Sequence, residues 1–172
     1  MGCDPCNRLN CEYGVCEDKS CKCDVGYLGD ECETKSAPKN IIVTMVSIES
    51  LPEEIFGLKK WDDDTTTSTA YLADVMLQVR LGTADKDVFT SVERYPDSKE
   101  TAFVFKESMR IKVPNPFPEI RLTLSDLDEL KPTKMYSITV SNYYSPFGDF
   151  PETFEMENED GVMVLIHLSY EH

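Results

Sequence analysis

Residues 6–32 read CNRLNCEYGVCEDKSCKCDVGYLGDEC, and their cysteine spacing decides the fold of the first part of the chain. Four residues separate Cys6 from Cys11, Cys11 from Cys16 and Cys16 from Cys21, one separates Cys21 from Cys23, and eight separate Cys23 from Cys32. All 7 cysteines of the 172-residue chain lie between Cys3 and Cys32. Dense cysteines in a segment too short to build a core indicate disulfides and an oxidising compartment. We therefore expect a secreted protein or the extracellular face of the cell surface.

The tail of this stretch, from Cys21 to Cys32, carries a family pattern. Cys-x-Cys followed by Cys-Asp-Val-Gly-Tyr-Leu-Gly-Asp-Glu-Cys resembles the signature of EGF-like modules. Gly26 and Gly29 would supply the positive φ angles that the tight turns need, and Tyr27 an apolar body to pack. Six cysteines allow fifteen pairings, and the spacing itself does not choose among them. The resemblance implies disulfides Cys6–Cys16, Cys11–Cys21 and Cys23–Cys32.

A zinc-binding cysteine cluster is the competing interpretation of these cysteines. It is disfavoured because Cys-x-x-Cys occurs once, at Cys3 and Cys6, and no histidine lies nearby. Cys3 is left over, and we expect it to pair with a cysteine of a preceding module or of another chain. The acidic residues around the cysteines do not match those of calcium-binding EGF-like modules. We therefore interpret residues 1–36 as a structural module.

Beyond residue 36 the chain lacks cysteine and alternates apolar with polar residues. Ile120, Leu122 and Leu124 fall on one face of a predicted strand, and residues 161–170 repeat the pattern. Strands are expected at 41–51, 71–82, 87–94, 101–113, 119–125, 135–142 and 161–170. Seven or eight antiparallel strands at this spacing predict a β-sandwich. We therefore expect a mainly β chain, with the EGF-like module at residues 1–36 and an eight-stranded antiparallel β-sandwich at residues 37–172.

Five stretches of the second part resemble, in order, the strands of C2 domains, the calcium- and phospholipid-binding type of β-sandwich. They are IIVTMVSIESLP at 41–52, LADVMLQVRLG at 72–82, FVFKESMRI at 103–111, LTLSDLD at 122–128 and GVMVLIHLSY at 161–170. Each stretch is short, and their order carries the resemblance. It implies a C2-like domain in which aspartates from two loops at one end of the sandwich hold calcium.

The resemblance transfers three calcium ligands to this chain, Asp74, Asp126 and Asp128. Ser68 stands where a fourth acid is usual, and the nearby run of Asp62, Asp63 and Asp64 can replace it if the loop is longer. Lys134 occupies a further position where an aspartate is usual. Because a cation there weakens the site, we expect one weakly bound calcium ion. The alternative is that these acids are ordinary solvated loop residues.

Apolar side chains beside the acidic loops suggest contact with a membrane. Phe56, Leu58 and Trp61 precede the aspartate run, and Leu127 lies within the second acidic loop. A tryptophan ring suits the headgroup zone of a bilayer, since it is apolar yet retains an N–H donor. The alternative interpretation is that Phe56 or Trp61 does not contact a membrane but covers the end of the hydrophobic core. We expect a phospholipid surface as partner and no nucleic acid, because a net charge of −15 repels phosphate backbones.

Two further features bear on the class of function. Lys106, Arg110 and Lys112 form a basic face, which in C2 domains can bind phosphoinositides but which more often is simply solvated. The two histidines, His167 and His172, have no nucleophile in a catalytic pattern beside them. We therefore expect a binding module and not an enzyme.

Two functions remain open. The first is a calcium-dependent, lipid-binding module of a larger extracellular protein, similar to pore-forming proteins of the perforin type, in which an EGF-like module precedes a C2 domain. The second is a calcium-independent adhesion or receptor-recognition module that binds a cell-surface protein, similar to the C2-like domains of Notch ligands. Lys134 is the main argument for the second.

Overall fold

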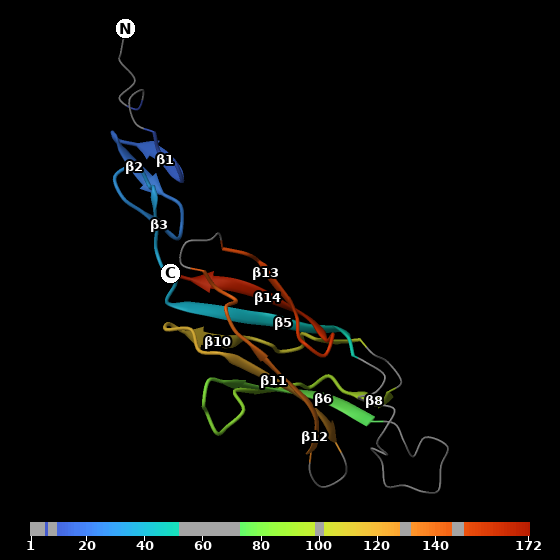
Figure 1. Cartoon of the computed structure of the whole chain (residues 1–172). Helices are drawn as coiled ribbons and strands as arrows, with labels where there is room; N and C mark the ends of the chain where they lie inside the picture. The colour runs from blue at the N-terminus through green and yellow to red at the C-terminus, as the bar shows by residue number, and fades with distance from the viewer. Residues whose placement is uncertain (1–5, 7–9, 52–72, 99–101, 128–131, 146–149) are drawn as a thin grey trace, which may run out of the picture.

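The structure is a computed structural model that describes residues 6, 10–51, 73–98, 102–127, 132–145 and 150–172. These residues form antiparallel strands and turns, with no helix among them, so the chain is mainly β as predicted. The described ranges contain no helix with the length and apolar character needed to cross a bilayer. Two parts are distinguished below, an N-terminal segment (residues up to 36) and a two-sheet region (residues 40–171), shown in Figure 1.

The N-terminal segment consists of two short hairpins. β1 (Gly14–Glu17) pairs with β2 (Ser20–Cys23), and β3 (Tyr27–Leu28) pairs with β4 (Thr34–Lys35). The first hairpin turns through Asp18 and Lys19, both with positive φ, at 51° and 71°. Two consecutive positive φ angles are characteristic of a type I′ hairpin turn, whose twist matches that of the paired strands.

Three disulfides hold this segment. They join Cys6 to Cys16, Cys11 to Cys21 and Cys23 to Cys32, which is the pairing that the EGF-like resemblance implies. Gly26 and Gly29 have φ of 93° and 106°, the positive values that the turns before Cys32 need. Cys3 lies outside the described residues. The disulfides indicate an extracellular or secreted protein.

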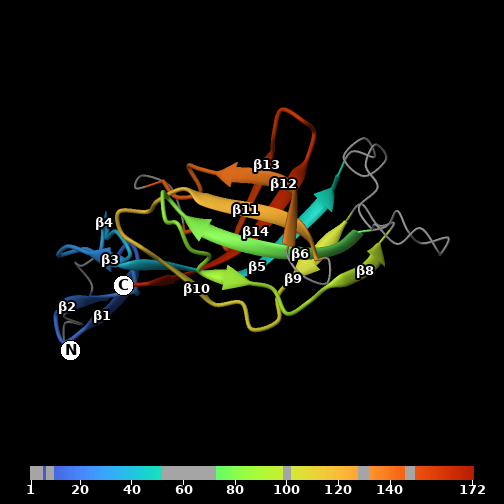
Figure 2. The same cartoon turned by 90° about the horizontal axis from the view of Figure 1, so that it is seen from below.

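Two five-stranded sheets make up the two-sheet region (Figures 1 and 2). The first sheet has the order β10-β5-β14-β13, with β9 also paired to β5. The second has the order β12-β11-β6-β7, with β8 also paired to β6. The strands of the first sheet are β5 (Asn40–Ser50), β9 (Phe103–Phe105), β10 (Ile111–Pro114), β13 (Thr153–Glu157) and β14 (Met163–Glu171). Those of the second are β6 (Ala73–Leu81), β7 (Phe89–Thr90), β8 (Tyr95–Ser98), β11 (Ile120–Leu127) and β12 (Pro132–Val140).

One hydrophobic core fills the space between the sheets. On β11 the predicted alternation is present, with Ile120, Leu122 and Leu124 buried and Arg121 exposed. The largest fully buried side chains of the core are Phe103, Phe105, Ile41, Ile48, Leu77, Ile120, Leu122, Leu124 and Ile166. Full burial of one such side chain contributes roughly 1.5–3 kcal/mol, so this region needs no covalent crosslink.

The strand boundaries differ from the predicted ones in three places. The single strand expected at 101–113 is two strands, because the chain turns at Ser108 with φ of 58° and the Glu93 carboxylate accepts the amides of Lys106 and Glu107. The strand expected at 87–94 contains only the short strand β7, and β8 begins directly after it, outside every predicted range. The prediction also missed β13, whose sequence TFEME alternates polar and apolar residues. The two-sheet region thus has ten strands where eight were expected.

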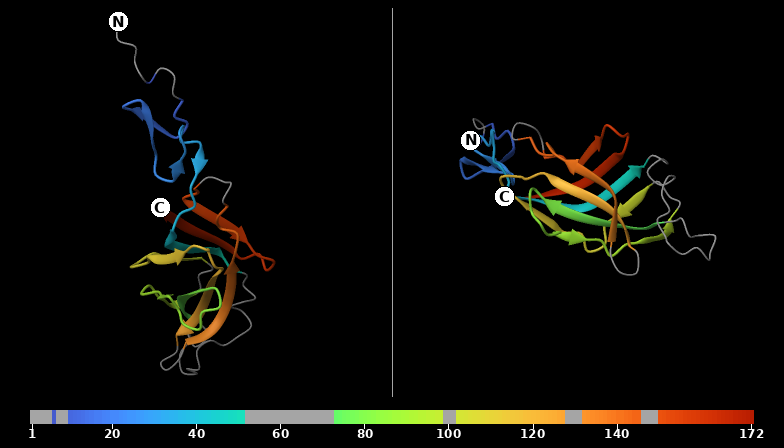
Figure 3. Two further views of the ribbon diagram at one scale, coloured as in Figure 1. Left: turned by 90° about the vertical axis from the view of Figure 1, so that its left-hand side faces the viewer. Right: turned by 60° about the horizontal axis from the view of Figure 1, so that its bottom comes forward.

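The N-terminal segment projects from the end of the two-sheet region where β5 begins and β14 ends, as Figures 1 and 3 show. At the far end, β6 begins and β11 ends (Figure 2). The two ends of the two-sheet region therefore carry different candidate sites, the predicted acidic site at one and the contact with the N-terminal segment at the other.

Candidate functional site

Two of the predicted calcium ligands come together at the far end of the second sheet. Asp74 lies near the start of β6 and Asp126 near the end of β11, and these strands are antiparallel neighbours in which Asp126 faces Val75. The backbone amide of Asp74 donates a hydrogen bond to Oδ1 of Asp126, with 2.7 Å between nitrogen and oxygen. Residues 52 positions apart in the sequence are thus in direct contact.

Asp126 is fully buried, whereas Asp74 is half-buried. The burial of Asp126 follows from its position, because it continues the inward-facing series of Leu122 and Leu124 on β11. A buried carboxylate is costly unless it is hydrogen-bonded, and the amide of Asp74 provides one such bond. This bond also holds the beginning of β6 against β11, so Asp126 has a structural role whether or not it binds an ion.

The other members of the predicted acidic and membrane-contacting sites are mostly outside the described residues. Those outside are Asp62, Asp63, Asp64, Asp128, Phe56, Leu58 and Trp61. Leu127 is described, and it is half-buried at the end of β11. Within the described ranges, no group of three or more His, Cys, Asp or Glu side chains is placed to hold a metal ion. A calcium ion takes six to eight oxygens, so Asp74 and Asp126 would be two ligands of a larger set.

Lys134 lies close to this pair along the sheet. It is exposed on β12 and faces Ser125, one position before Asp126 on β11. The positive side chain therefore starts on the strand next to Asp126. It shares a face with Ser125, whereas Asp126 pairs with Thr133 and points inward, so the strand pairing does not place the lysine charge against the Asp126 carboxylate.

The positive charge of the basic face formed by Lys106, Arg110 and Lys112 is partly neutralised by a nearby carboxylate. Nη2 of Arg110 lies 3.2 Å from Oε1 of Glu171, and Nζ of Lys112 lies 2.9 Å from Oε2 of the same carboxylate. The hydrogen bond from Lys112 is the main cause that lowers the pKa of Glu171 below its usual value. Lys106 is exposed. Since one carboxylate engages two of the three cations, this arrangement favours a solvated face over a phosphoinositide site.

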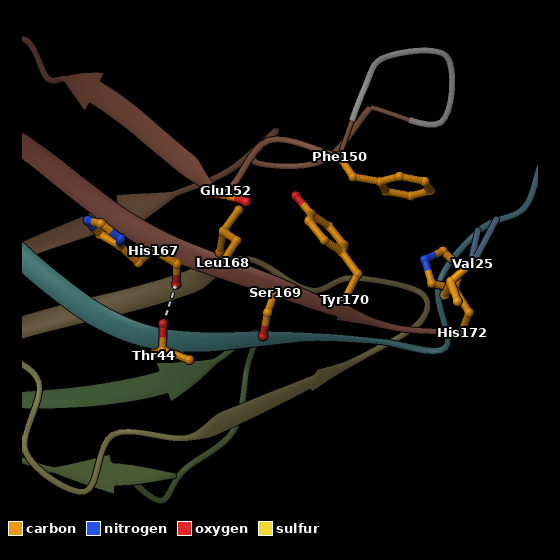
Figure 4. Close-up of a pocket in the computed structure, with 9 residues that line it drawn as sticks. All are labelled: Val25, Thr44, Phe150, Glu152, His167, Leu168, Ser169, Tyr170 and His172. Carbon is orange, nitrogen blue, oxygen red and sulfur yellow. Dashed lines mark hydrogen bonds between the residues drawn. The ribbon is translucent and has the colours of Figure 1, made fainter. Parts of the chain in front are cut away.

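A groove of about 490 Å³, which the sequence did not predict, lies where the N-terminal segment meets the first sheet (Figure 4). It is lined by Val25, Thr44, Phe150, Glu152, His167, Leu168, Ser169, Tyr170 and His172. The Tyr170 hydroxyl donates to the carbonyl oxygen of Pro151 at 2.7 Å, and burial raises the pKa of Tyr170 to about 12. Tyr170 is therefore neutral at physiological pH.

The ring of Phe150 connects the two parts of the chain at one end of this groove. Its centroid lies 6.1 Å from that of Tyr27 in the N-terminal segment and 5.1 Å from that of Tyr170 on β14. Sequence reasoning had no signal for this contact, because residues 27, 150 and 170 meet only through the tertiary fold.

A smaller cavity, of about 360 Å³, lies beside the link between the two parts. Ala37, Asn115, Pro116, Phe117, Asn142, Tyr143 and Tyr144 line it. The rings of Phe117 and Tyr144 meet edge to face at 4.9 Å, and the Tyr143 hydroxyl donates to the carbonyl oxygen of Pro118 at 2.5 Å. These contacts tie the β10–β11 and β12–β13 connections together.

Comparison of the sequence with known proteins does not assign the chain to a family. No protein-family model matches the chain, and no curated protein matches it.

Proposed function

We propose that the chain is an EGF-like module followed by a C2-like β-sandwich, and that it attaches an extracellular protein to phospholipid membranes through calcium. The strand pairing supports the C2-like assignment. β9 and β10 both pair with β5, and β7 and β8 both pair with β6. When each pair is counted as one interrupted strand, the region has eight strands in two four-stranded sheets.

The juxtaposition of Asp74 and Asp126 carries the functional proposal. Two acids selected from separate sequence stretches lie on neighbouring strands at one end, joined by a hydrogen bond of 2.7 Å. Carboxylate oxygens are preferred calcium ligands, and Asp128 follows Asp126 by two positions. A bound cation would also allow a chain of net charge −15 to approach an anionic bilayer.

The proposed membrane contact is at the same end. Leu127 adjoins Asp126, and Phe56, Leu58 and Trp61 lie in the sequence between β5 and β6. In this proposal the calcium ion bridges the acids to lipid phosphate while these apolar side chains enter the headgroup zone. The parent protein would be of the pore-forming, perforin type, or another extracellular protein that must be held at a membrane.

Liposome co-sedimentation tests this function directly. The full chain is mixed with vesicles of phosphatidylcholine and phosphatidylserine, in millimolar calcium or in chelator. The proposal expects sedimentation only with calcium, because extracellular sites of this kind have Kd values on the order of 10⁻⁴ to 10⁻³ M. Binding that ignores calcium, or no binding, contradicts it.

The double variant Asp126→Asn with Asp128→Asn should abolish calcium-dependent sedimentation. Asparagine keeps a side-chain oxygen that can accept the amide hydrogen bond of Asp74, so the fold is retained while two charges are removed. Asp85→Asn is the matched control, since Asp85 is exposed beyond the other end of β6 and should bind as the wild type does. Equal binding by all three proteins would place the calcium effect elsewhere.

Calcium-independent recognition of a cell-surface protein is the second candidate. The N-terminal segment exposes large apolar side chains, with Val25 80%, Val15 61% and Leu28 57% accessible. Lys134 also stands where an aspartate is usual in C2 domains, which leaves the acidic site with one ligand fewer. Under this alternative, calcium neither promotes sedimentation nor raises the melting temperature of the protein, and binding to cells survives chelation.

A further inference from the structure

The contact between the N-terminal segment and the first sheet is built around one aromatic ring. Phe150 receives Tyr27 edge-on from the N-terminal segment, and Nζ of Lys35 lies 3.8 Å from the centroid of the Phe150 ring. From the first sheet, Tyr170 and His172 pack against the same ring. We refer to these five residues, Tyr27, Lys35, Phe150, Tyr170 and His172, as the joint.

His172 fits tightly within the joint. Its ring meets that of Phe150 edge to face, with the centroids 4.9 Å apart, and its Nδ1 lies 3.3 Å from Oγ of Ser36. A Cβ atom on Gly26 would lie 2.9 Å from two atoms of the imidazole ring, so the ring packs directly on the backbone of the N-terminal segment. Figure 4 shows Phe150, Val25 and His172 together at one end of the groove.

Lys35 and Lys39 are the cationic side chains near His172, which in the 172-residue chain also carries the terminal carboxylate. Lys35 lies across the ring of Phe150, and Nζ of Lys39 donates to the backbone oxygen of His172 at 3.4 Å. The adjacent carboxylate, Glu171, is engaged by Arg110 and Lys112. Burial is the main cause that lowers the pKa of His172, and Lys35 and Lys39 lower it further. Glu152, His167 and Tyr170 are the other titratable residues of the groove.

We propose that the joint is a pH-sensitive switch that holds the N-terminal segment against the first sheet while His172 is neutral and releases it when His172 is protonated. A third positive charge beside Lys35 and Lys39, on a ring packed against Phe150, favours the open arrangement, in which water can solvate the imidazolium. The switch therefore acts between neutral surroundings and an acidified compartment.

The direction of the pH dependence follows from proton linkage. In the open arrangement His172 regains an ordinary pKa of about 6.5, whereas in the closed joint its pKa is lower. The closed joint thus binds fewer protons. Its stability is fully present above about pH 6.5 and is lost as the pH falls through the lowered pKa of the closed joint.

Nuclear magnetic resonance relaxation on the full chain tests the switch. At pH 7.4 the N-terminal segment and the two-sheet region should tumble with one rotational correlation time. At pH 5.5 the N-terminal segment should have the shorter one, and the amide of Gly26 should lose its ring-current shift from Phe150. Unchanged resonances from the core, such as those of Ile166, distinguish opening from unfolding. A single correlation time at both pH values overturns the proposal.

The chain has 2 histidines, so it provides its own matched control. His172→Gln should remain closed at pH 5.5, because glutamine is uncharged and still offers a polar partner to Ser36. His167→Gln should open as the wild type does, since His167 lines the groove but makes none of the joint contacts described above. If His167→Gln abolishes the response, or His172→Gln retains it, then His172 is not the switch.

Lys39→Gln provides a second test that leaves His172 in place. Removing one positive neighbour makes protonation of His172 in the closed joint less unfavourable, so less of the protein should open at pH 5.5. Opening equal to or greater than that of the wild type would contradict the role given to the lysines. The test involves neither calcium nor lipid, so its outcome is independent of the function proposed above.

Discussion

The N-terminal segment and the two-sheet region are stabilised in different ways. Between Cys6 and Cys32, three disulfides connect short hairpins, and large apolar side chains such as Val15 and Leu28 remain exposed. The two-sheet region contains no cysteine and buries its apolar residues in one core. A chain too short to bury enough surface limits the entropy of its unfolded state through crosslinks, whereas a longer chain is stabilised by burial.

The largest effect should come from removing a core ring. Phe103→Ala deletes a side chain that is 1% exposed between the sheets, which should lower the free energy of unfolding of the two-sheet region by about 3–5 kcal/mol. The free energy of unfolding is measured by chemical denaturation, with a spectroscopic signal from the two sheets as the readout. Val104→Ala is the control, because Val104 on the same strand is exposed and its loss should be small. Similar losses for both variants would mean that the core does not dominate.

Removing a crosslink should affect the other part of the chain. Cys11→Ala with Cys21→Ala deletes one disulfide, which should cost the N-terminal segment about 2–5 kcal/mol and unfold it. Hydrogen exchange should then show rapid exchange across β1 and β2 with unchanged protection in β5 and β14. Loss of protection in both parts would show that they fold as a single unit, which would remove the contrast drawn here.

Gly26, which lies beside the joint, should reveal how strongly the two parts are coupled. Gly26→Ala adds a Cβ at φ of 93°, 2.7 Å from a ring atom of Phe150, so the substitution strains the backbone and pushes the joint apart. We expect a loss of about 1–3 kcal/mol together with shifted resonances of His172. Gly161→Ala isolates the backbone cost, because Gly161 has φ of 75° but an added Cβ would lie 3.9 Å from Oε1 of Glu157, at an ordinary contact distance. Unshifted His172 resonances in Gly26→Ala would argue against the packing described.

The smallest effect should come from the surface of the first sheet. Glu171→Gln removes the partner of Arg110 and Lys112, but these pairs are largely exposed and screened by water and salt. Because the pKa of Glu171 is lowered, its contribution is present at neutral pH and is lost as the pH falls through that pKa. The melting temperature at pH 7 should change by no more than about one or two degrees. A larger change would mean that these ion pairs contribute substantially to stability.

Local sequence patterns predicted the parts of the fold that depend on neighbouring residues. Cysteine spacing indicated a disulfide framework, and the alternation of Ile120, Leu122 and Leu124 indicated the inner face of β11. The strands β9 and β10 were read as one because the break at Ser108 depends on Glu93, a residue 15 positions earlier that accepts the amides beside the turn. Such long-range hydrogen bonds leave no local signal.

The candidate site shows the same limit. The proximity of Asp74 and Asp126 was anticipated only through the C2 resemblance, since periodicity does not say which strands are neighbours. The joint was not anticipated, because Phe150 and His172 meet Tyr27 and Lys35 through tertiary packing alone. The ligand role of Asp128 and of Asp62, Asp63 and Asp64 stays a prediction, as these residues lie outside the described ranges.

β13 has a consequence for how the protein behaves at high concentration. It lies at the edge of the first sheet and, in the described part of the chain, pairs with β14 alone. Its exposed side chains include Glu155 and Glu157, with Glu152 just before the strand and Glu159 just after it. A second copy that approached this edge would bring an identical acidic row against it. The repulsion protects the open edge from strand-to-strand aggregation and helps to keep the protein soluble.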